Sequence, residues 1–409
     1  MKRTSQPIST VASQLLRWSL PVIMLLAACG IYRVTRVSTS DDSLATLPNQ
    51  PNVVPVRYDL PLVATDQQLF EVLNRVLPPE GPAHTNNYVH ALRLWGPQAK
   101  FANPKVPDGA TMLSYFLDDA TFRKLAGNNA PPLFRETDGL IDSRAWQEAD
   151  PHNRTGAVHV DDLLATLAES GVPLDAPLKM RDGVATVGDL LRSAMRRFHH
   201  EQHEYEWTAI SYARYLFPAK RWKNQYGQPI DLDGLVDELL EQPLPNGVCG
   251  GTHRLEALVV LARIDDQVGA LSRRSRRKLI QHLGGVSQRL IAAQQLEGYW
   301  TRSWTTGSQT SGEENTAETD SSLYERILLT GHHLEWLALA PPEVQPPREV
   351  IVRAGQWLVR ALLEAGDSEL RDRYGPCTHA ARALCLWRGK DPYHAWRQGQ
   401  LRDVVAQAE

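Results

Sequence analysis

The sequence predicts an all-α fold, and three observations favour it. Apolar residues recur at helical three- and four-residue spacing from Asp66 onward, and no segment alternates apolar and polar residues as a half-buried strand does. Strongly apolar helices alternate with amphipathic ones along the chain. The interval from Trp207 to His253 equals that from His333 to His379, as expected for a repeated helix-loop-helix unit.

An inner ring of buried helices inside an outer ring of half-exposed helices explains this alternation. We therefore predict an α/α toroid of repeated helical hairpins, either closed or incomplete, over residues 65–409.

Length and composition narrow the class of protein. The chain has 409 residues, of which 42% are hydrophobic and 22% charged, and its net charge is -3. This is an ordinary globular composition without the basic excess of a nucleic-acid-binding protein. Four cysteines are too few for a scaffold built on disulfides.

Residues 1–37 are predicted to be a targeting segment rather than part of the fold. Basic residues precede the apolar run 20–28, which ends in Leu-Ala-Ala-Cys29 and resembles a bacterial lipoprotein signal with Cys29 as the lipidated residue. Arg33 and Arg36, just beyond this cysteine, favour the alternative of an uncleaved signal anchor. Both alternatives place the body outside the cytoplasm, anchored to a membrane of the bacterial envelope through the N-terminus.

The remaining elements follow in chain order. Residues 38–64 are rich in Ser, Asp, Pro and Asn, and predict an extended tether. Periodicity, capping residues and Pro stops then predict helices at 66–77, 88–94, 112–125, 159–169, 187–198, 207–216, 232–240, 252–262, 271–295, 323–339, 350–365, 378–387 and 394–408.

Two Cys–His pairs stand at the starts of apolar helices, Cys249 with His253 and Cys377 with His379. Three interpretations stay open. The pairs form a closed Cys2His2 zinc site, Cys249 and Cys377 form a disulfide, or the small residues let helix starts pack closely while each His bonds to a neighbouring backbone. Cys385 lies two turns after Cys377 and is predicted to be core.

The segment Gly331-His332-His333-Leu334-Glu335 carries the best catalytic candidates, because His332 and Glu335 share a helix face. This G-H-x-x-E arrangement resembles that of the N-acylglucosamine and cellobiose 2-epimerases, α/α toroids that use paired histidines for proton transfer on a sugar. The resemblance implies catalytic roles for His332 and Glu335 only. No motif places the second catalytic histidine of that family, for which His253 and His379 are candidates. The alternative is a His–Glu hydrogen bond that only stabilises the inner ring.

A second resemblance supports the toroid. The segment Gln295-Leu-Glu-Gly298-Tyr-Trp300 is similar to the Q-x-x-G-x-W repeat of the terpenoid cyclase and prenyltransferase type of toroid, where it ties an outer helix to its neighbour. The acidic DxDD pattern with which such cyclases protonate an alkene is missing, and the acidic loop 313–320 does not supply it.

Four further residues are predicted to bind a ligand in the central cavity. Glu206 and Trp207 lie in a polar cluster just before an apolar helix, and Trp207 and Trp300 are candidate surfaces for stacking a sugar. His333 neighbours the catalytic candidates.

Three functional hypotheses follow. The first is an enzyme, or former enzyme, of the envelope whose polar cavity handles a carbohydrate, with His332, Glu335, His253 and His379 in proton transfer. The second is a non-catalytic scaffold or binding module for an envelope protein. The third is terpenoid or lipid chemistry in an apolar cavity. Enzyme activity stays undecided, and no cofactor is predicted. As a whole the chain resembles membrane-anchored bacterial toroid proteins that combine C-x-G-T-H and G-H-x-x-E-W segments.

Overall fold

Helices make up most of the chain that the computed structural model describes, namely residues 47–81, 84–145, 155–217, 221–306 and 322–408. These residues form the α-helices α2 to α16 and three short β-hairpins. The chain is therefore mostly helical, as the sequence predicts.

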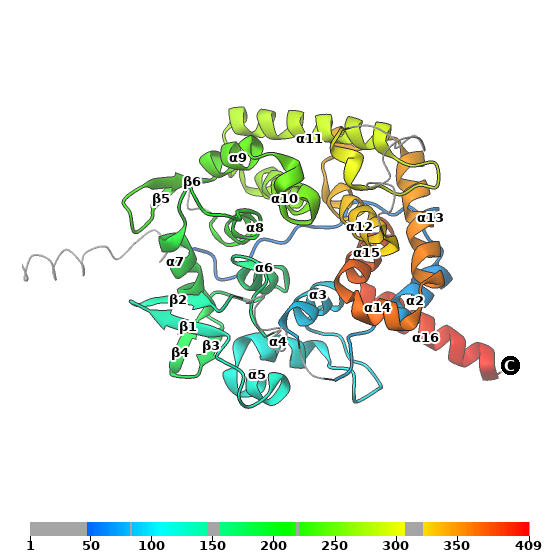
Figure 1. The fold of residues 1–409 in the computed structure, drawn as a ribbon, viewed down its shortest axis with the longest axis horizontal. Coiled ribbons are helices and arrows are strands. Elements are labelled where there is room, and N and C mark those ends of the chain that lie inside the picture. The colour runs from blue at the N-terminus through cyan, green and yellow to red at the C-terminus, as the bar shows by residue number, and fades with distance from the viewer. Residues whose placement is uncertain (1–46, 82–83, 146–154, 218–220, 307–321, 409) are drawn as a thin grey trace, which may run out of the picture. The chain divides into compact units, whose positions relative to one another are not determined.

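Six helices contact one another in a cycle, each packing on the next and the last on the first (Figure 1). All ten residues of α8 and most residues of the other five are buried, which explains why these helices are apolar nearly all round. In order they are α3 (Thr85–Trp95), α6 (Asp162–Glu169), α8 (Glu206–Tyr215), α10 (Thr252–Val268), α12 (Leu323–Leu339) and α15 (Tyr374–Trp387).

Amphipathic helices lie outside this cycle and bury one face against it. In α11, for example, the buried positions follow the three- and four-residue spacing of one helix face. These helices are α2 (Asp66–Arg75), α4 (Gly109–Leu117), α5 (Asp119–Ala126), α7 (Val187–Arg197), α9 (Leu232–Glu241), α11 (Arg273–Ala293), α13 (Arg348–Glu364) and α16 (Pro392–Ala408), with the short α14 (Asp367–Asp372) before α15.

One predicted helix, 112–125, is two helices in the structure. Asp118 adopts an extended backbone between α4 and α5, and its side chain accepts a hydrogen bond from the Ala120 N–H at 2.9 Å. This N-cap starts a new helix in place of continuing the old one.

Three antiparallel hairpins lie where the sequence predicts no strand, so that prediction is wrong there. They pair β1 (Phe134–Thr137) with β2 (Leu140–Ser143), β3 (Pro177–Met180) with β4 (Gly183–Thr186), and β5 (Arg221–Lys223) with β6 (Pro229–Asp231). Strands of three or four residues are too short to show a period of two. The first hairpin turns at Asp138-Gly139, both with positive φ, a turn signal that the sequence did contain.

The described part of the predicted tether, residues 47–64, contains no helix or strand, and it is bound to the helices. The N–H of Asn52 donates to a carbonyl at the end of α8, and that of Leu60 donates to a carbonyl at the end of α15, both at 2.7 Å. Residues 49–64 therefore follow the C-terminal ends of the central helices, and the helical unit begins at Leu47.

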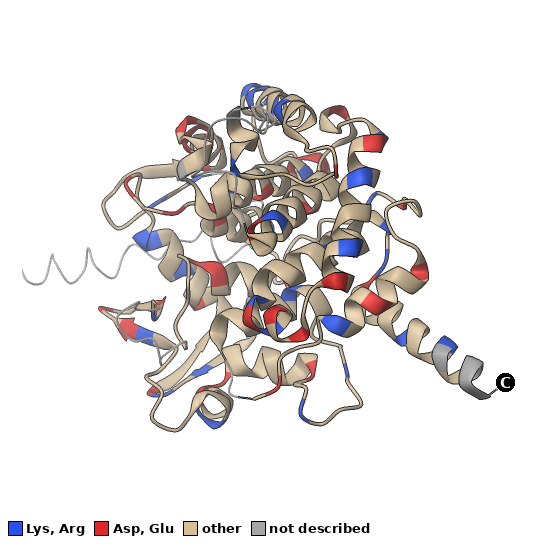
Figure 2. Cartoon of the chain, turned by 45° about the vertical axis from the view of Figure 1, so that its right-hand side comes forward, with Lys and Arg blue, Asp and Glu red and all other residues tan. Residues whose placement is uncertain are grey.

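None of the described helices is long and apolar enough to cross a membrane. The predicted anchor, with Cys29, and the acidic loop 313–320 lie outside the described residues. Acidic and basic side chains are interspersed over the described helices (Figure 2), in keeping with the net charge of -3.

Candidate functional site

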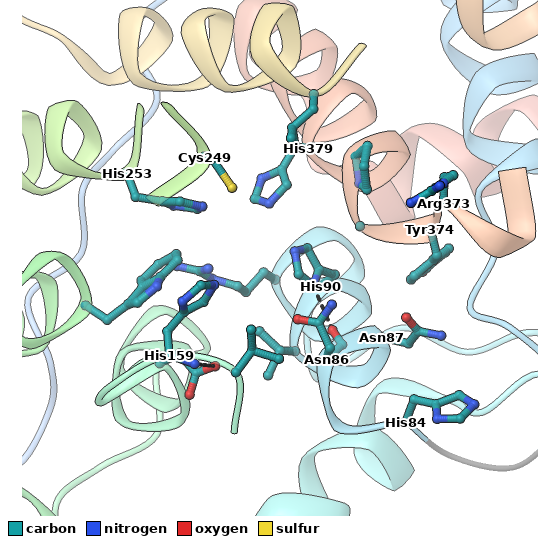
Figure 3. A pocket seen from close by; sticks show the side chains of 18 of the residues that line it. His84, Asn86, Asn87, His90, His159, Cys249, His253, Arg373, Tyr374 and His379 are labelled. Carbon is teal, nitrogen blue, oxygen red and sulfur yellow. Dashed lines mark hydrogen bonds between the residues drawn. The ribbon is translucent and has the colours of Figure 1, made fainter. Parts of the chain in front are cut away.

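A pocket of 410 Å³ lies at the N-terminal ends of the central helices (Figure 3). This volume is within the range of small-molecule sites. Its polar lining comes from four central helices and the turn before α10, and includes His90, Arg93, His159, Asp162, Cys249, His253 and His379.

The turn before α10 presents the only thiol among the lining residues. Cys249, Gly250 and Gly251 all have left-handed backbones, with φ of 49°, 67° and 84°. A Cβ on Gly251 would lie 2.3 Å from the Leu244 carbonyl oxygen, so only glycine fits there. Non-glycine residues such as Cys249 rarely adopt this conformation, which costs about 1–2 kcal/mol. The turn thus holds the cysteine in a strained position at the pocket wall.

Three buried histidines from successive helices meet beside this thiol. The ring centroids of His253 and His332 are 4.4 Å apart, those of His332 and His379 are 3.8 Å apart, and those of His253 and His379 are 5.7 Å apart. Gly331 permits the close approach of α12 to α15, because a Cβ there would lie 2.9 Å from the Ala380 nitrogen. The structure brings together all four residues predicted to be catalytic, since Glu335 contacts two of these rings.

Glu335 is the carboxylate that orients the histidines. Its Oε2 lies 2.7 Å from Nδ1 of His379 and 3.2 Å from Nδ1 of His332. Its Oε1 accepts a 2.8 Å hydrogen bond from Arg382. An ionised carboxylate only accepts hydrogen bonds, so Nδ1 of His379 carries the hydrogen and Nε2 keeps its lone pair. Figure 3 shows the His379 ring at the edge of the pocket, close to Cys249.

Four central helices repeat one pattern, a histidine followed three residues later by a charged residue. The pairs are His90/Arg93, His253/Glu256, His332/Glu335 and His379/Arg382. Three residues advance a helix by about 4.5 Å, so a layer of histidines lies above a layer of charges. We recognised only His332/Glu335 from the sequence, although the recurrence of H-x-x-E and H-x-x-R was visible there. His90, Arg93, His159 and Asp162 are therefore pocket residues that the sequence analysis missed.

The charged layer is a buried ion network. Arg382 Nη1 is 3.4 Å from Glu256 Oε1, and its Nη2 is 3.7 Å from Glu169 Oε1. Glu169 also pairs with Arg93 and Arg214. Pairing each charge in this way offsets the cost of removing it from water, and it fixes the carboxylates beneath the histidines.

The cluster shifts the protonation of its members. Burial alone would raise the pKa of the Cys249 thiol, but the neighbouring His253 and His332 hold that pKa well below its ordinary value. Burial alone would lower the pKa of His253, but the neighbouring Cys249 and Glu256 outweigh it and raise that pKa to about 10. Burial would likewise raise the pKa of Glu335, which His379 and the Arg382 guanidinium hold well below its ordinary value. The site therefore favours a thiolate.

Of the predicted binding residues, only Trp207 lines the pocket. The Arg93 guanidinium covers its ring at 3.9 Å from the centroid, so that face is not free to stack a sugar. Glu206 pairs with Arg254 instead, at 3.2 Å. Trp300 is fully buried, and His333 is packed against it with 5.4 Å between ring centroids.

The second predicted Cys–His pair does not act as a unit. Cys377 is buried and free, Cys249 is free, and no disulfide joins them. The described donor clusters contain His379 but not Cys377. Residues two apart point about 200° from each other round a helix, so Cys377 and His379 cannot face one ion. Cys385 is buried, as predicted for a core residue.

The Q-x-x-G-x-W segment ties two outer helices, but through a different glutamine. Gln294, not Gln295, donates to the carbonyls of Gly298 and Val350 at 2.9 and 2.8 Å, which joins the end of α11 to α13. The Trp300 indole N–H donates to the Leu290 carbonyl at 2.9 Å. The tie that the resemblance implies for Gln295 is therefore made by its neighbour Gln294, while the Gln295 side chain donates, among the described residues, only to the Ala293 carbonyl.

Two donor sets within the described residues are close enough to hold a metal ion. They are Cys249, His253 and His332, and His332, Glu335 and His379, with the donor atoms of each set within 4.8 Å of one another.

The chain matches no protein-family model, no curated protein and no solved structure.

Proposed function

We propose that residues 65–409 form an α/α toroid of helical hairpins, and that it is an enzyme moving protons on a carbohydrate-like substrate. The cyclic packing of six buried helices inside amphipathic ones supports the toroid. The basic residues, the apolar run and the Leu-Ala-Ala-Cys29 end of residues 1–37 support anchoring to the membrane, outside the cytoplasm.

The observation that carries the enzymatic proposal is the Arg382–Glu335–His379 relay at the pocket edge. Arg382 fixes one oxygen of Glu335 at 2.8 Å, and the other oxygen fixes His379 at 2.7 Å. A base needs a free ring nitrogen facing the substrate and a partner that holds its tautomer, and His379 has both. We assign His379 as the general base and Glu335 as the residue that positions it.

The chemistry of the pocket favours a polar substrate over a terpenoid. Asn86, Asn87, His90 and His159 line it, and they offer hydrogen bonds to hydroxyl groups. A terpenoid cavity would need a deep aromatic lining, whereas the histidines and carboxylates converge here. The same convergence favours an enzyme over a scaffold.

The proposed reaction abstracts a proton from the carbon beside the carbonyl of an open-chain sugar. His379 Nε2 takes the proton, and the C–H electron pair forms the enolate. A water molecule on the opposite face gives a proton to that carbon and inverts it, and the resulting hydroxide takes the proton of His379 through solvent. In D2O the returning proton is a deuteron. Proton NMR of a panel of neutral and N-acylated hexoses in D2O therefore detects turnover as loss of the signal of the adjacent C–H.

His379→Asn keeps a donor for Glu335 but removes Nε2, so the exchange rate is expected to fall by about 100-fold or more. His394→Asn is the matched control, because Nδ1 of His394 also lies next to a carboxylate, that of Asp391 at 2.9 Å, but this histidine is exposed. No exchange with any sugar of the panel would refute the substrate class. Exchange that survives His379→Asn would refute the base.

A further inference from the structure

We propose that Cys249, His253 and His332 bind one zinc ion at the pocket wall, with a fourth coordination position left open to the pocket. Their donor atoms lie within 4.8 Å of one another. Tetrahedral zinc holds sulfur and nitrogen donors about 3.5 Å apart, so side-chain adjustments alone would close the site. Zinc favours this mixture of thiolate and imidazole.

The backbone is built to aim the thiol at the two rings. The left-handed turn ends at Gly251, and α10 begins at Thr252, whose hydroxyl donates to the Cys249 carbonyl at 3.0 Å. His253 is the second residue of α10, four residues after Cys249, and His332 reaches it from α12. Packing does not explain a strained cysteine that faces two histidines. Glycine or alanine would also fill the turn, but neither would bring a thiol to the two imidazole rings.

The carboxylates behind the rings match what metal-binding histidines require. Such a histidine usually gives its second N–H to a carboxylate, which orients the ring and makes it a better donor. Here Nδ1 of His332 lies 3.2 Å from Glu335, whereas Nδ1 of His253 lies 3.8 Å from Glu256, within ion-pair range but beyond hydrogen-bond distance. Arg382 holds both carboxylates, at 2.8 and 3.4 Å.

Two ring nitrogens of the proposed ligands, Nε2 of His332 and Nδ1 of His253, have no hydrogen-bond partner within the described structure. Nε2 of His332 is buried and makes no hydrogen bond, although the His332 side chain is only 2% exposed. Leaving a buried polar atom unsatisfied costs about 1–3 kcal/mol. A metal bound by Nε2, with Nδ1 on Glu335, satisfies both ring nitrogens.

A thiolate nucleophile without metal is the competing interpretation of the same cluster. A nucleophile needs one base, and His253 would suffice. The cluster instead supplies two imidazoles from two helices, each with its own carboxylate, which is the ligand set of an ion. The inference deepens the proposed function, since zinc beside His379 would stabilise the enolate oxygen, but its test uses no substrate.

The test measures zinc alone on the full-length protein. The protein is stripped with a chelator, reloaded with Zn²⁺, desalted and analysed by ICP-MS, and affinity is measured by competition with a chromophoric chelator. We expect one zinc per chain, lost in Cys249→Ser and in His332→Asn. Glu335→Gln is expected to weaken binding by about 10–100-fold. Replacement by Co²⁺ is expected to give a thiolate-to-cobalt charge-transfer band that Cys249→Ser removes.

Controls separate this site from its alternatives. Cys377→Ala removes the other predicted cysteine ligand and is expected to keep the zinc. His379→Asn is also expected to keep it, so loss of proton transfer and loss of metal are distinct results. Loss of zinc in His379→Asn would identify His379 as a ligand and would refute an open fourth coordination position. Folded protein, checked by circular dichroism, that binds no zinc or binds it equally in Cys249→Ser would overturn the proposal. Rapid alkylation of Cys249 in that metal-free protein would assign the nucleophile instead.

Discussion

Replacement of Arg382 by methionine tests the ion network beneath the histidines. Arg382 lies 2.8, 3.4 and 3.7 Å from Glu335, Glu256 and Glu169, whose side chains are 1%, 3% and 5% exposed. Methionine fills much of the same volume but cannot pair with a carboxylate. The perturbation therefore leaves three buried carboxylates without the cation that they share.

Breaking one partner of a buried ion pair costs about 3–5 kcal/mol, because a charge stays buried without compensation. We expect Arg382→Met to lose about this much unfolding free energy, measured by urea denaturation at pH 7. Arg192→Met is the control. Arg192 pairs with Asp189 at the surface, where the side chains are 50% and 37% exposed, and such a pair contributes about 0–1 kcal/mol.

A double-mutant cycle separates the network from simple packing. Glu335→Gln in the Arg382→Met background removes one uncompensated charge, so the double variant is expected to lose at least about 1 kcal/mol less than the sum of the single variants. Strict additivity, or a loss below about 1 kcal/mol for Arg382→Met, would refute the reasoning that these charges stabilise one another.

Three further predictions follow from single positions. Burial raises the pKa of Asp162 to about 6, against about 3.9 when unfolded, so its contribution to stability is present below pH 4 and is lost as the pH rises through 6. Asp162→Asn is thus expected to gain about 1–3 kcal/mol over the wild type at pH 7 but nothing at pH 4, and an equal difference in urea denaturation at both pH values would contradict this. Gly251→Ala places a Cβ against the Leu244 carbonyl and is expected to lower the free energy of unfolding by more than about 3 kcal/mol. Gly269 is also left-handed but has open space around it, so Gly269→Ala is expected to lower it by about 1 kcal/mol. Equal melting temperatures of the two variants would argue against the clash. Gln294→Ala removes two buried hydrogen bonds and one partly buried one, and it is expected to cost about 2–4 kcal/mol by urea denaturation. A loss within about 0.5 kcal/mol, the scale of an ordinary surface change, would exclude the tie between α11 and α13.

Where structure depends on neighbours in the chain, the sequence predicted it well. The helix predicted at 323–339 has those bounds in the structure, because its apolar spacing and its Ser322 cap are local signals. The sequence did not predict the three hairpins, because their strands are too short to show the period of two that identifies a strand. Residues 38–64 were predicted to be a tether because composition indicates a lack of helix and does not show the surface to which a segment binds.

The sequence by itself determined that His332 faces the same side as Glu335, since helical spacing fixes which residues of one helix share a face. That Cys249 also meets His253 was decided by the left-handed turn before α10. Only the tertiary structure decided that Glu335 would meet His379, 44 residues away, and share Arg382 with Glu256. The reason is physical. Such contacts depend on how each helix is rotated about its axis and how closely it packs on the next, and those quantities follow from the whole core.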